Sequence, residues 1–212
     1  MNFKFNQLQK TKPFQSAEYW EKRYRENGNS GLGSYNKLAI FKAEIINDFI
    51  TKNNIKSIVD YGMGDGNQLK LFKIENINYI GIDVSPTIIE KCKNLYKFDK
   101  FKQFILEREI DNISSELVLS CDVIYHLIED DVYYKYIDNL FKMSKKFVII
   151  YAPDIDMIHK QHVKLRKFTD YIKNNYSNWK LINFIKNKYP QKIIGVNDKE
   201  TSFSDFFIYE NT

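Results

Sequence analysis

The chain has 212 residues and a mass of 25.3 kDa, a size at which one domain hides about 70% of the surface exposed by the unfolded chain. Hydrophobic residues make up 43% and charged residues 28% of the sequence, a composition that excludes the disordered and fibrous classes. The net charge is +5, but the lysines and arginines are scattered along the chain. We therefore expect a solvated basic surface and no nucleic-acid footprint.

The apolar runs are short, and none approaches the roughly 20 residues of a membrane span. The strongest run, residues 147–152, has the length of a strand, and the first ten residues lack the apolar core of a signal peptide. The two cysteines, Cys92 and Cys121, form neither a C-x-x-C pair nor a zinc-binding spacing. These features predict a soluble, reduced, cytoplasmic protein without a metal site and without a membrane partner.

The first third of the chain is expected to hold helices. Residues 1–15 are polar and predicted to form a loose arm, followed by a short helix over 19–24 and a glycine-rich stretch over 27–34. Ser34 is positioned to cap a longer helix, whose apolar residues recur at steps of three and four. The predicted core face of that helix consists of Leu38, Phe41, Ile45 and Phe49.

From residue 57 onward, strand-like and helix-like periods alternate, a pattern typical of βαβ units and a parallel sheet with helices on both faces. A helix is expected to begin at Ser85-Pro86, because serine caps helices and proline suits their first position. Further helices are predicted over 129–143 and, as a basic helix, over 160–175. The expected strands are 57–60, 79–83, 101–105, 117–120 and 146–151, with an antiparallel pair, 179–185 and 203–209, at the end of the chain.

The sharpest motif is the glycine turn, residues 59–66, with the sequence V-D-Y-G-M-G-D-G directly after a predicted strand. Gly62 and Gly64 allow a tight reversal and bring bare backbone close to a ligand, and Gly66 is expected to let a following helix pack on the sheet. A dinucleotide site needs G-x-G-x-x-G, whereas here the third glycine comes one residue early. The carboxylates of Asp60 and Asp65 would also repel a pyrophosphate, so the turn favours a ligand with ammonium and sulfonium groups.

A second acidic position supports a nucleoside ligand. Asp83 ends the next predicted strand, 17 residues after Gly66, where a carboxylate can accept hydrogen bonds from both hydroxyls of a ribose. Alone, Asp83 could equally end a strand near the helix cap at Ser85. Its spacing from the glycine turn favours the ligand-binding interpretation.

The combination of D-x-G-x-G-x-G with a strand ending in I-D resembles the class I S-adenosylmethionine-dependent methyltransferases, from about Tyr19 through the last strand. The resemblance implies a Rossmann-like sheet of seven strands and a single methyltransferase domain over 1–212, with 1–35 as an arm or lid over the cofactor. It implies that S-adenosyl-L-methionine is the cofactor and S-adenosyl-L-homocysteine the product. It assigns cofactor binding to Tyr24, Ser34, Asp60, Gly62, Gly64, Asp83, Val84, Leu106, Glu107, Ser120 and Cys121.

In that family, the acceptor lies beyond the fourth strand, which here continues as S-C-D-V-I-Y-H over 120–126. Asp122 is therefore a candidate for substrate binding and His126 for the general base, unless His126 only caps the helix after it. The N-P-P-Y sequence of enzymes that methylate nucleobase amines is absent there. His162 and Arg166 are four residues apart, so on a helix they would share a face suited to an anionic acceptor. A solvated basic helix is the alternative interpretation.

Two segments, 162–171 and 19–35, resemble methyltransferases encoded among bacterial capsule and surface-polysaccharide genes. The resulting hypothesis is methyl transfer, by in-line displacement, to an oxygen of an anionic sugar or phosphoramidate precursor, with His126 or His162 as base. An RNA or protein methyltransferase of the same fold and a cofactor-binding protein without catalysis remain as alternatives. A dinucleotide oxidoreductase is the least favoured interpretation, for the charge reasons given.

Overall fold

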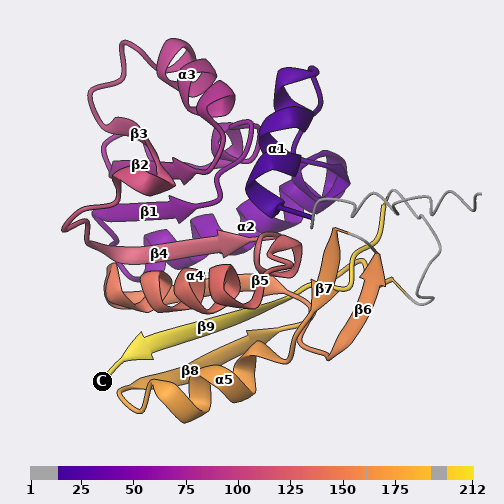
Figure 1. Ribbon diagram of the computed structural model, residues 1–212. Coiled ribbons are helices and arrows are strands. Elements are labelled where there is room, and N and C mark those ends of the chain that lie inside the picture. Colours follow the sequence, from indigo (N-terminus) through magenta and orange to yellow (C-terminus); the bar gives the residue numbers. More distant parts are fainter. Residues whose placement is uncertain (1–13, 161, 192–199) are drawn as a thin grey trace, which may run out of the picture.

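A single seven-stranded sheet organises the computed structural model, which describes residues 14–160, 162–191 and 200–212 (Figure 1). Its strand order is β3-β2-β1-β4-β5-β9-β8. The first five strands in this order, β3-β2-β1-β4-β5, pair in parallel, and β9 is antiparallel to both of its neighbours. The strands are β1 (Ser57–Tyr61), β2 (Asn78–Asp83), β3 (Lys102–Leu106), β4 (Ser115–Cys121), β5 (Ser144–Ala152), β8 (Trp179–Ile185) and β9 (Asp205–Asn211). The predicted fold, a mostly parallel sheet ending in an antiparallel pair, is confirmed.

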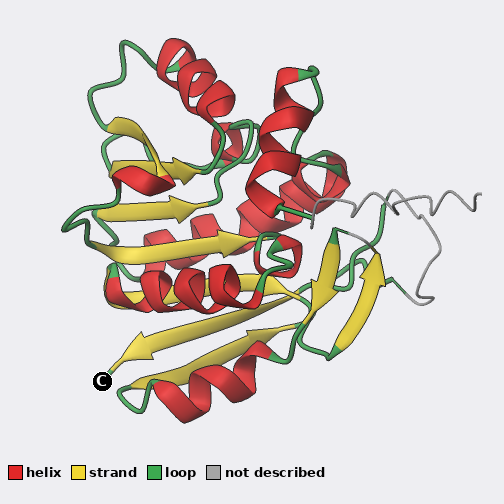
Figure 2. Cartoon of the chain, viewed as in Figure 1, coloured by secondary structure: helices red, strands yellow, loops and turns green. Residues whose placement is uncertain are grey.

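Helices cover both faces of the sheet, because the central strands bury alternate side chains on opposite sides (Figure 2). Ile58 of β1 packs with one helical layer and its neighbour Val59 packs with the other. The first layer contains α1 (Ser16–Arg25), α2 (Asn36–Lys52) and α3 (Pro86–Leu95). The second contains α4 (Asp130–Lys142) and α5 (Phe168–Asn175).

Two serines were predicted to cap helices, and one of these predictions is correct. The Ser85 hydroxyl accepts a hydrogen bond from Ile88 N at 3.2 Å, with Pro86 at the first helical position, as expected for α3. The prediction that Ser34 caps α2 is wrong. Ser34 lies in a short 3-10 helix, Leu32–Ser34, and α2 begins at Asn36 after an extended Tyr35.

The helix expected after the glycine turn is not formed, which corrects the role proposed for Gly66. The chain makes only a 3-10 turn, Leu69–Leu71, before it enters β2. The two residues before this turn are hydrogen-bonded to the start of the α2 region: the Asn67 side chain donates to Ser34 O at 2.7 Å and the Gln68 side chain donates to Ala39 O at 3.0 Å. The long helix α2 thus lies against this segment.

The basic helix predicted over 160–175 is also partly wrong. Strand β6 (Met157–Lys160) pairs antiparallel with β7 (Val163–Leu165), and of the described residues in this range 168–175 are helical (Figure 1). Val163 and Leu165 are buried while Lys164 between them is not, which is the two-residue period of a strand. His162 and Arg166 therefore do not share a helix face.

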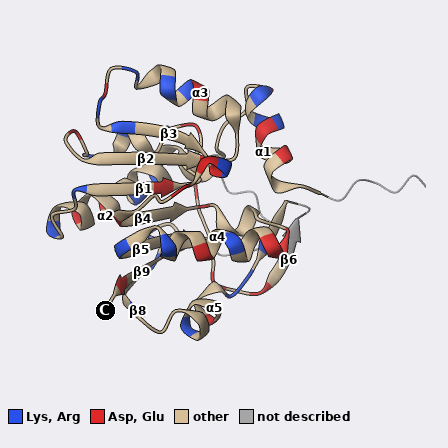
Figure 3. Cartoon of the chain, turned by 60° about the vertical axis from the view of Figure 1, so that its left-hand side comes forward, with Lys and Arg blue, Asp and Glu red and all other residues tan. Residues whose placement is uncertain are grey.

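Charged residues are spread over the outside of the fold. Figure 3 shows basic residues on several helices and loops, interspersed with acidic ones. This distribution agrees with the solvated basic surface expected from the sequence. In the described part of the chain, no helix is both long and apolar enough to cross a bilayer.

Candidate functional site

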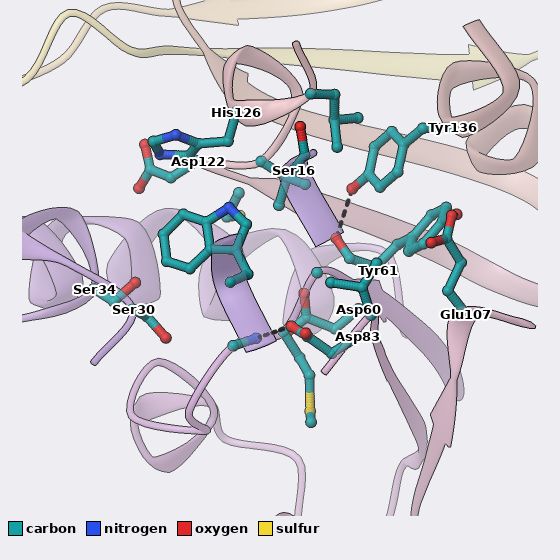
Figure 4. A pocket seen from close by; sticks show the side chains of 18 of the residues that line it. Ser16, Ser30, Ser34, Asp60, Tyr61, Asp83, Glu107, Asp122, His126 and Tyr136 are labelled. Atoms are coloured by element: carbon teal, nitrogen blue, oxygen red, sulfur yellow. Dashed lines mark hydrogen bonds between the residues drawn. The ribbon is translucent and has the colours of Figure 1, made fainter. Parts of the chain in front are cut away.

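A pocket opens at the carboxyl ends of β1, β2 and β4, under α1, where ligands bind in open parallel sheets (Figure 4). Four residues of α1 line one side of it: Ser16, Ala17, Trp20 and Tyr24. The glycine turn and the ends of β2 and β4 line the opposite side. The pocket thus lies between α1 and the end of the sheet that carries the glycine turn and Asp83.

The glycine turn approaches its neighbours so closely that side chains would not fit. A Cβ at Gly62 would lie 2.4 Å from Val123 Cγ2, and one at Gly64 would lie 2.2 Å from Ser30 Oγ. Both glycines also have positive φ angles, 81° and 62°, which other residues rarely adopt. The turn therefore packs closely against both the loop after β4 and the segment after α1.

Asp83 and Asp60 are buried carboxylates on the floor of the pocket (Figure 4). Asp83 accepts hydrogen bonds from Gly64 N and Ser85 N, each at 3.0 Å, which fix its orientation toward the turn. Asp60 accepts one from Tyr79 Oη at 2.9 Å. Burial raises the pKa of each carboxyl to about 6, so each gains from a ligand that supplies positive charge or hydrogen-bond donors.

Asp65, the other acidic residue of the turn, has a different role. It accepts hydrogen bonds from Ser30 N at 3.0 Å and Tyr35 Oη at 2.7 Å. Burial alone would raise its pKa, but these bonds, together with one from Asn67 N, outweigh burial and hold the pKa of Asp65 below its usual value. Asp65 thus stabilises the segment that follows α1.

The cofactor-binding residues predicted around the ends of β3 and β4 separate into two groups. Glu107, after β3, lines the pocket and accepts a hydrogen bond from Tyr61 Oη, and Cys121 lines it at the end of β4. Leu106 and Ser120 are buried, but the described lining does not include them. The Ser120 hydroxyl is bonded to Tyr136 Oη at 2.9 Å.

His126 lies at the far end of the pocket, against the indole of Trp20, with ring centroids 5.0 Å apart (Figure 4). Its Nδ1 is 3.0 Å from the carbonyl oxygen of His162. Because a carbonyl only accepts hydrogen bonds, Nδ1 carries the proton and Nε2 keeps a free lone pair. Burial lowers the pKa of His126 to about 4, so the ring is neutral at pH 7.

Asp122, the residue after β4, is joined to Lys42 in a buried ion pair that the sequence did not predict. Lys42 Nζ lies 2.6 Å from Asp122 Oδ2, and the Lys42 side chain is only 1% exposed. The other carboxylate oxygen accepts from Tyr125 Oη at 3.0 Å and Ser204 Oγ at 3.1 Å. Asp122 also has a φ of 60°, an uncommon value for a residue other than glycine.

His162 and Arg166, the basis of the predicted anion site, do not reach the described lining. The His162 ring stacks on Tyr19, at a centroid distance of 5.1 Å, on the outer side of His126. Arg166 donates to the carbonyl oxygens of Leu127 and Ile128 at 2.7 and 2.9 Å and pairs with Asp130. These bonds hold the segment after β7 to the loop before α4.

The pocket brings together most of the predicted site residues. Those that line it are Tyr24, Ser34, Asp60, Gly62, Gly64, Asp83, Val84, Glu107, Cys121, Asp122 and His126. The sequence analysis missed several lining residues, chiefly Ser16, Trp20, Lys42, Gln68 and Tyr136. The predicted helix over 19–24 already contains Trp20. No local pattern marks Lys42, which occupies a core position of α2, or Gln68, which follows the glycine turn.

Comparison with known proteins supports the interpretation of this region. Residues 59–149 match the family model of the methyltransferase domain. The match begins within β1 and ends within β5, so it contains the glycine turn, Asp83 and the loop that carries Asp122 and His126. This match supports the resemblance to methyltransferases that the sequence motifs indicate. No curated protein matches the chain. The likeness to enzymes of capsule genes stays a prediction.

Solved structures share the fold at low sequence identity. The N-methyltransferase NodS from Bradyrhizobium japonicum WM9, in complex with S-adenosyl-L-homocysteine, aligns with a TM-score of 0.67 and 13% identity over 93% of this chain and 99% of that one. The 1,6-didemethyltoxoflavin-N1-methyltransferase of Burkholderia thailandensis gives 0.66 and 12%, over 92% and 87%. Magnesium protoporphyrin IX methyltransferase from Synechocystis PCC 6803 gives 0.63 and 12%, over 92% and 98%. At these identities the likeness shows the fold.

Proposed function

We propose that the chain is an S-adenosylmethionine-dependent methyltransferase that acts on a small molecule. The observation that carries the proposal is the pair of buried carboxylates, Asp60 and Asp83, on either side of a glycine turn inside the segment that matches the methyltransferase domain. Several structural neighbours were solved with S-adenosylmethionine or S-adenosylhomocysteine bound, which supports the same cofactor. S-Adenosylmethionine supplies a methyl group activated by a sulfonium.

The residues of this chain fit that cofactor. Asp83 is positioned to accept hydrogen bonds from ribose hydroxyls, since its backbone partners at Gly64 and Ser85 fix the carboxylate. Asp60 and the apolar lining around it favour a positively charged group over a phosphate. Glu107 lies at the end of β3, on the side that we assign to the adenine.

We assign the acceptor to the other end of the pocket, between Trp20, Asp122 and His126. The free Nε2 lone pair of His126 suits a hydrogen bond from a hydroxyl or amine hydrogen of the acceptor, which orients the attacking atom. With a pKa of about 4, the imidazole is a weak base, so we assign it orientation as its main contribution. Complete alignment of donor and acceptor can contribute on the order of 7–11 kcal/mol to methyl transfer, and the bond to His126 supplies part of it.

The acceptor itself is proposed only as a class. The resemblance of residues 19–35 and 162–171 to enzymes of surface-polysaccharide genes supports a sugar or a related precursor, methylated on oxygen. The proposed acceptor needs no negative charge, because the cations Lys42 and Arg166 are engaged elsewhere. Within the described lining, the Lys42 ammonium is paired with Asp122, and Arg166 lies outside the pocket. We place the activity in the cytoplasm, since both cysteines are free thiols.

Calorimetric titration with S-adenosylhomocysteine, beside NADH, tests the cofactor. We expect saturable binding of the thioether and none of NADH, and we expect Asp83→Ala to weaken binding at least tenfold. Asp99→Ala is the matched control, because Asp99 bonds Lys102 and Phe101 N at the start of β3, outside the described lining. Preference for NADH, or equal effects of the two substitutions, would contradict the proposed function.

A further inference from the structure

Gln68 lines the pocket, and its side-chain carbonyl oxygen is a buried hydrogen-bond acceptor without a partner. The residue is 6% exposed and lines the pocket directly after the glycine turn. Its Nε2 donates to Ala39 O at 3.0 Å, whereas its Oε1 has no hydrogen-bond partner. Among the pocket-lining side chains that the structure describes, Oε1 of Gln68 is the one buried polar atom left unsatisfied.

The orientation of this amide follows from its neighbour. If the amide were flipped, Oε1 would face the carbonyl oxygen of Ala39, and two acceptors would meet without a hydrogen between them. The bond to α2 therefore fixes the carbonyl of Gln68 away from the helix. A buried oxygen of this kind lowers stability until a donor reaches it, so its place in a ligand pocket indicates a donor on the ligand.

Nearby protein donors are already engaged. Lys42, three residues after Ala39 on α2, is paired with Asp122, and the side-chain amide of Asn67 donates to Ser34 O. Asp60 lies close enough to both Lys42 and Asp83 for their charges to act on it. The ribose and adenine positions assigned above lie where β2 and β3 terminate, and the acceptor is assigned to Trp20, Asp122 and His126. Among the parts of the cofactor, the amino-acid end remains for Gln68, which directly follows the glycine turn.

We propose that Oε1 of Gln68 accepts a hydrogen bond from the ammonium group of S-adenosylmethionine, and this proposal rests on the proposed function. An ammonium carries three N–H donors, and a buried one needs several acceptors. Asp60 supplies charge and Gln68 supplies a neutral acceptor whose direction is fixed by α2. Gln68 thereby contributes to the choice of a ligand with a free amino group over nucleosides that lack one.

The test compares two ligands that differ only in this group. One is S-adenosylhomocysteine, and the other is its analogue without the amino group, the 3-carboxypropyl thioether of 5′-deoxyadenosine. Calorimetry gives the ratio of their affinities for the wild type, for Gln68→Met and for the control Asp83→Asn. Because the ratio is taken within each variant, a general loosening of the pocket cancels.

We expect Gln68→Met to weaken binding of S-adenosylhomocysteine about tenfold or more and to leave the analogue within about twofold of the wild type. Asp83→Asn should weaken both ligands alike. Equal effects of Gln68→Met on both ligands, or none on either, would overturn the inference while leaving the cofactor intact. If the wild type binds neither ligand, the proposed function fails together with it.

A measurement on the unaltered protein covers the case in which Gln68→Met does not fold. The side-chain amide signals of Gln68 in a ¹⁵N-labelled sample should shift on addition of S-adenosylhomocysteine and stay in place with the analogue. The same shift with both ligands would overturn the inference.

Discussion

The buried ion pair between Lys42 and Asp122 offers the most demanding test of the structure. Lys42 projects from α2, and its ammonium is 2.6 Å from a carboxylate at the end of β4, with side-chain exposures of 1% and 10%. Replacing Lys42 by methionine keeps the length and apolar stem of the side chain but leaves the charge of Asp122 without its counter-ion. Tyr125 and Ser204 still donate to Asp122, so the carboxylate retains hydrogen bonds while it loses the opposite charge.

Removal of one partner of a buried pair destabilises proteins by about 3–5 kcal/mol, because the other charge stays buried. For a chain of this size, about 1 kcal/mol corresponds to 2–4 °C in Tm, so Lys42→Met should lower Tm by roughly 6–20 °C. Asp122→Asn in the same chain should recover most of the loss. Asparagine tolerates the φ of 60° at this position, still accepts hydrogen bonds, and carries no charge.

Urea unfolding of the single and double variants measures the stability lost with Lys42→Met and the stability recovered with Asp122→Asn. Lys52→Met is the matched control on the same helix, since Lys52 pairs with Asp48 at the surface, with exposures of 72% and 58%. A surface pair of this kind contributes about 0–1 kcal/mol. If Lys42→Met costs no more than the control, or if the double variant is no better than Lys42→Met alone, the buried pair does not exist as described.

Three further predictions concern the pocket and its surroundings. Gly62→Ala places a methyl group 2.4 Å from Val123 Cγ2 at a φ of 81°, so we expect a loss of about 2 kcal/mol or more in urea unfolding and no calorimetric binding of S-adenosylhomocysteine. Burial raises the pKa of Asp83 to about 6, and only the ionised form accepts two ribose hydroxyls. Affinity should therefore fall about tenfold from pH 7 to pH 5, with proton release near pH 6 that Asp83→Asn reduces, as titrations in two buffers would reveal. Arg166→Ala removes donors to the carbonyls of 127 and 128 and should lower stability by about 2 kcal/mol, with cofactor affinity within twofold. If Arg166→Ala abolished cofactor binding without lowering the free energy of unfolding, Arg166 would have to be assigned to the binding site.

The glycine turn and the acidic residue at the end of the next strand were predictable because their chemistry is local. Gly62, Gly64 and Asp83 depend on neighbours a few residues away or on one strand pairing, and the structure places all three at the pocket. The strands were predictable for a similar reason, since a short apolar run of about five to nine residues between turns is typical of a buried strand.

Lys42 and Gln68 were not predictable, because their roles depend on contacts with distant segments. Lys42 occupies a position of α2 where the apolar period calls for a core residue, and only the fold reveals Asp122, 80 residues away, as its partner. The basic helix over 160–175 was misassigned because lysine, arginine and histidine hide the alternation of Val163 and Leu165. The pattern of His162 and Arg166 favoured an anion site, whereas Arg166 donates hydrogen bonds to the loop before α4.

The attachment of α1 has a kinetic consequence. Ser16, at its start, donates through N and Oγ to Glu129 at 2.8 and 2.5 Å, and Glu21, one turn further on, accepts from Ser85 Oγ and Thr87 Oγ1 at 2.5 and 2.7 Å. The helix is thus fastened to opposite rims of the pocket, ahead of α4 and at the start of α3. We expect a cofactor beneath this helix to leave when one of these attachments opens. A turnover rate limited by that opening would be the same for fast and slow acceptors, and it would rise when Glu21 or Glu129 loses its charge.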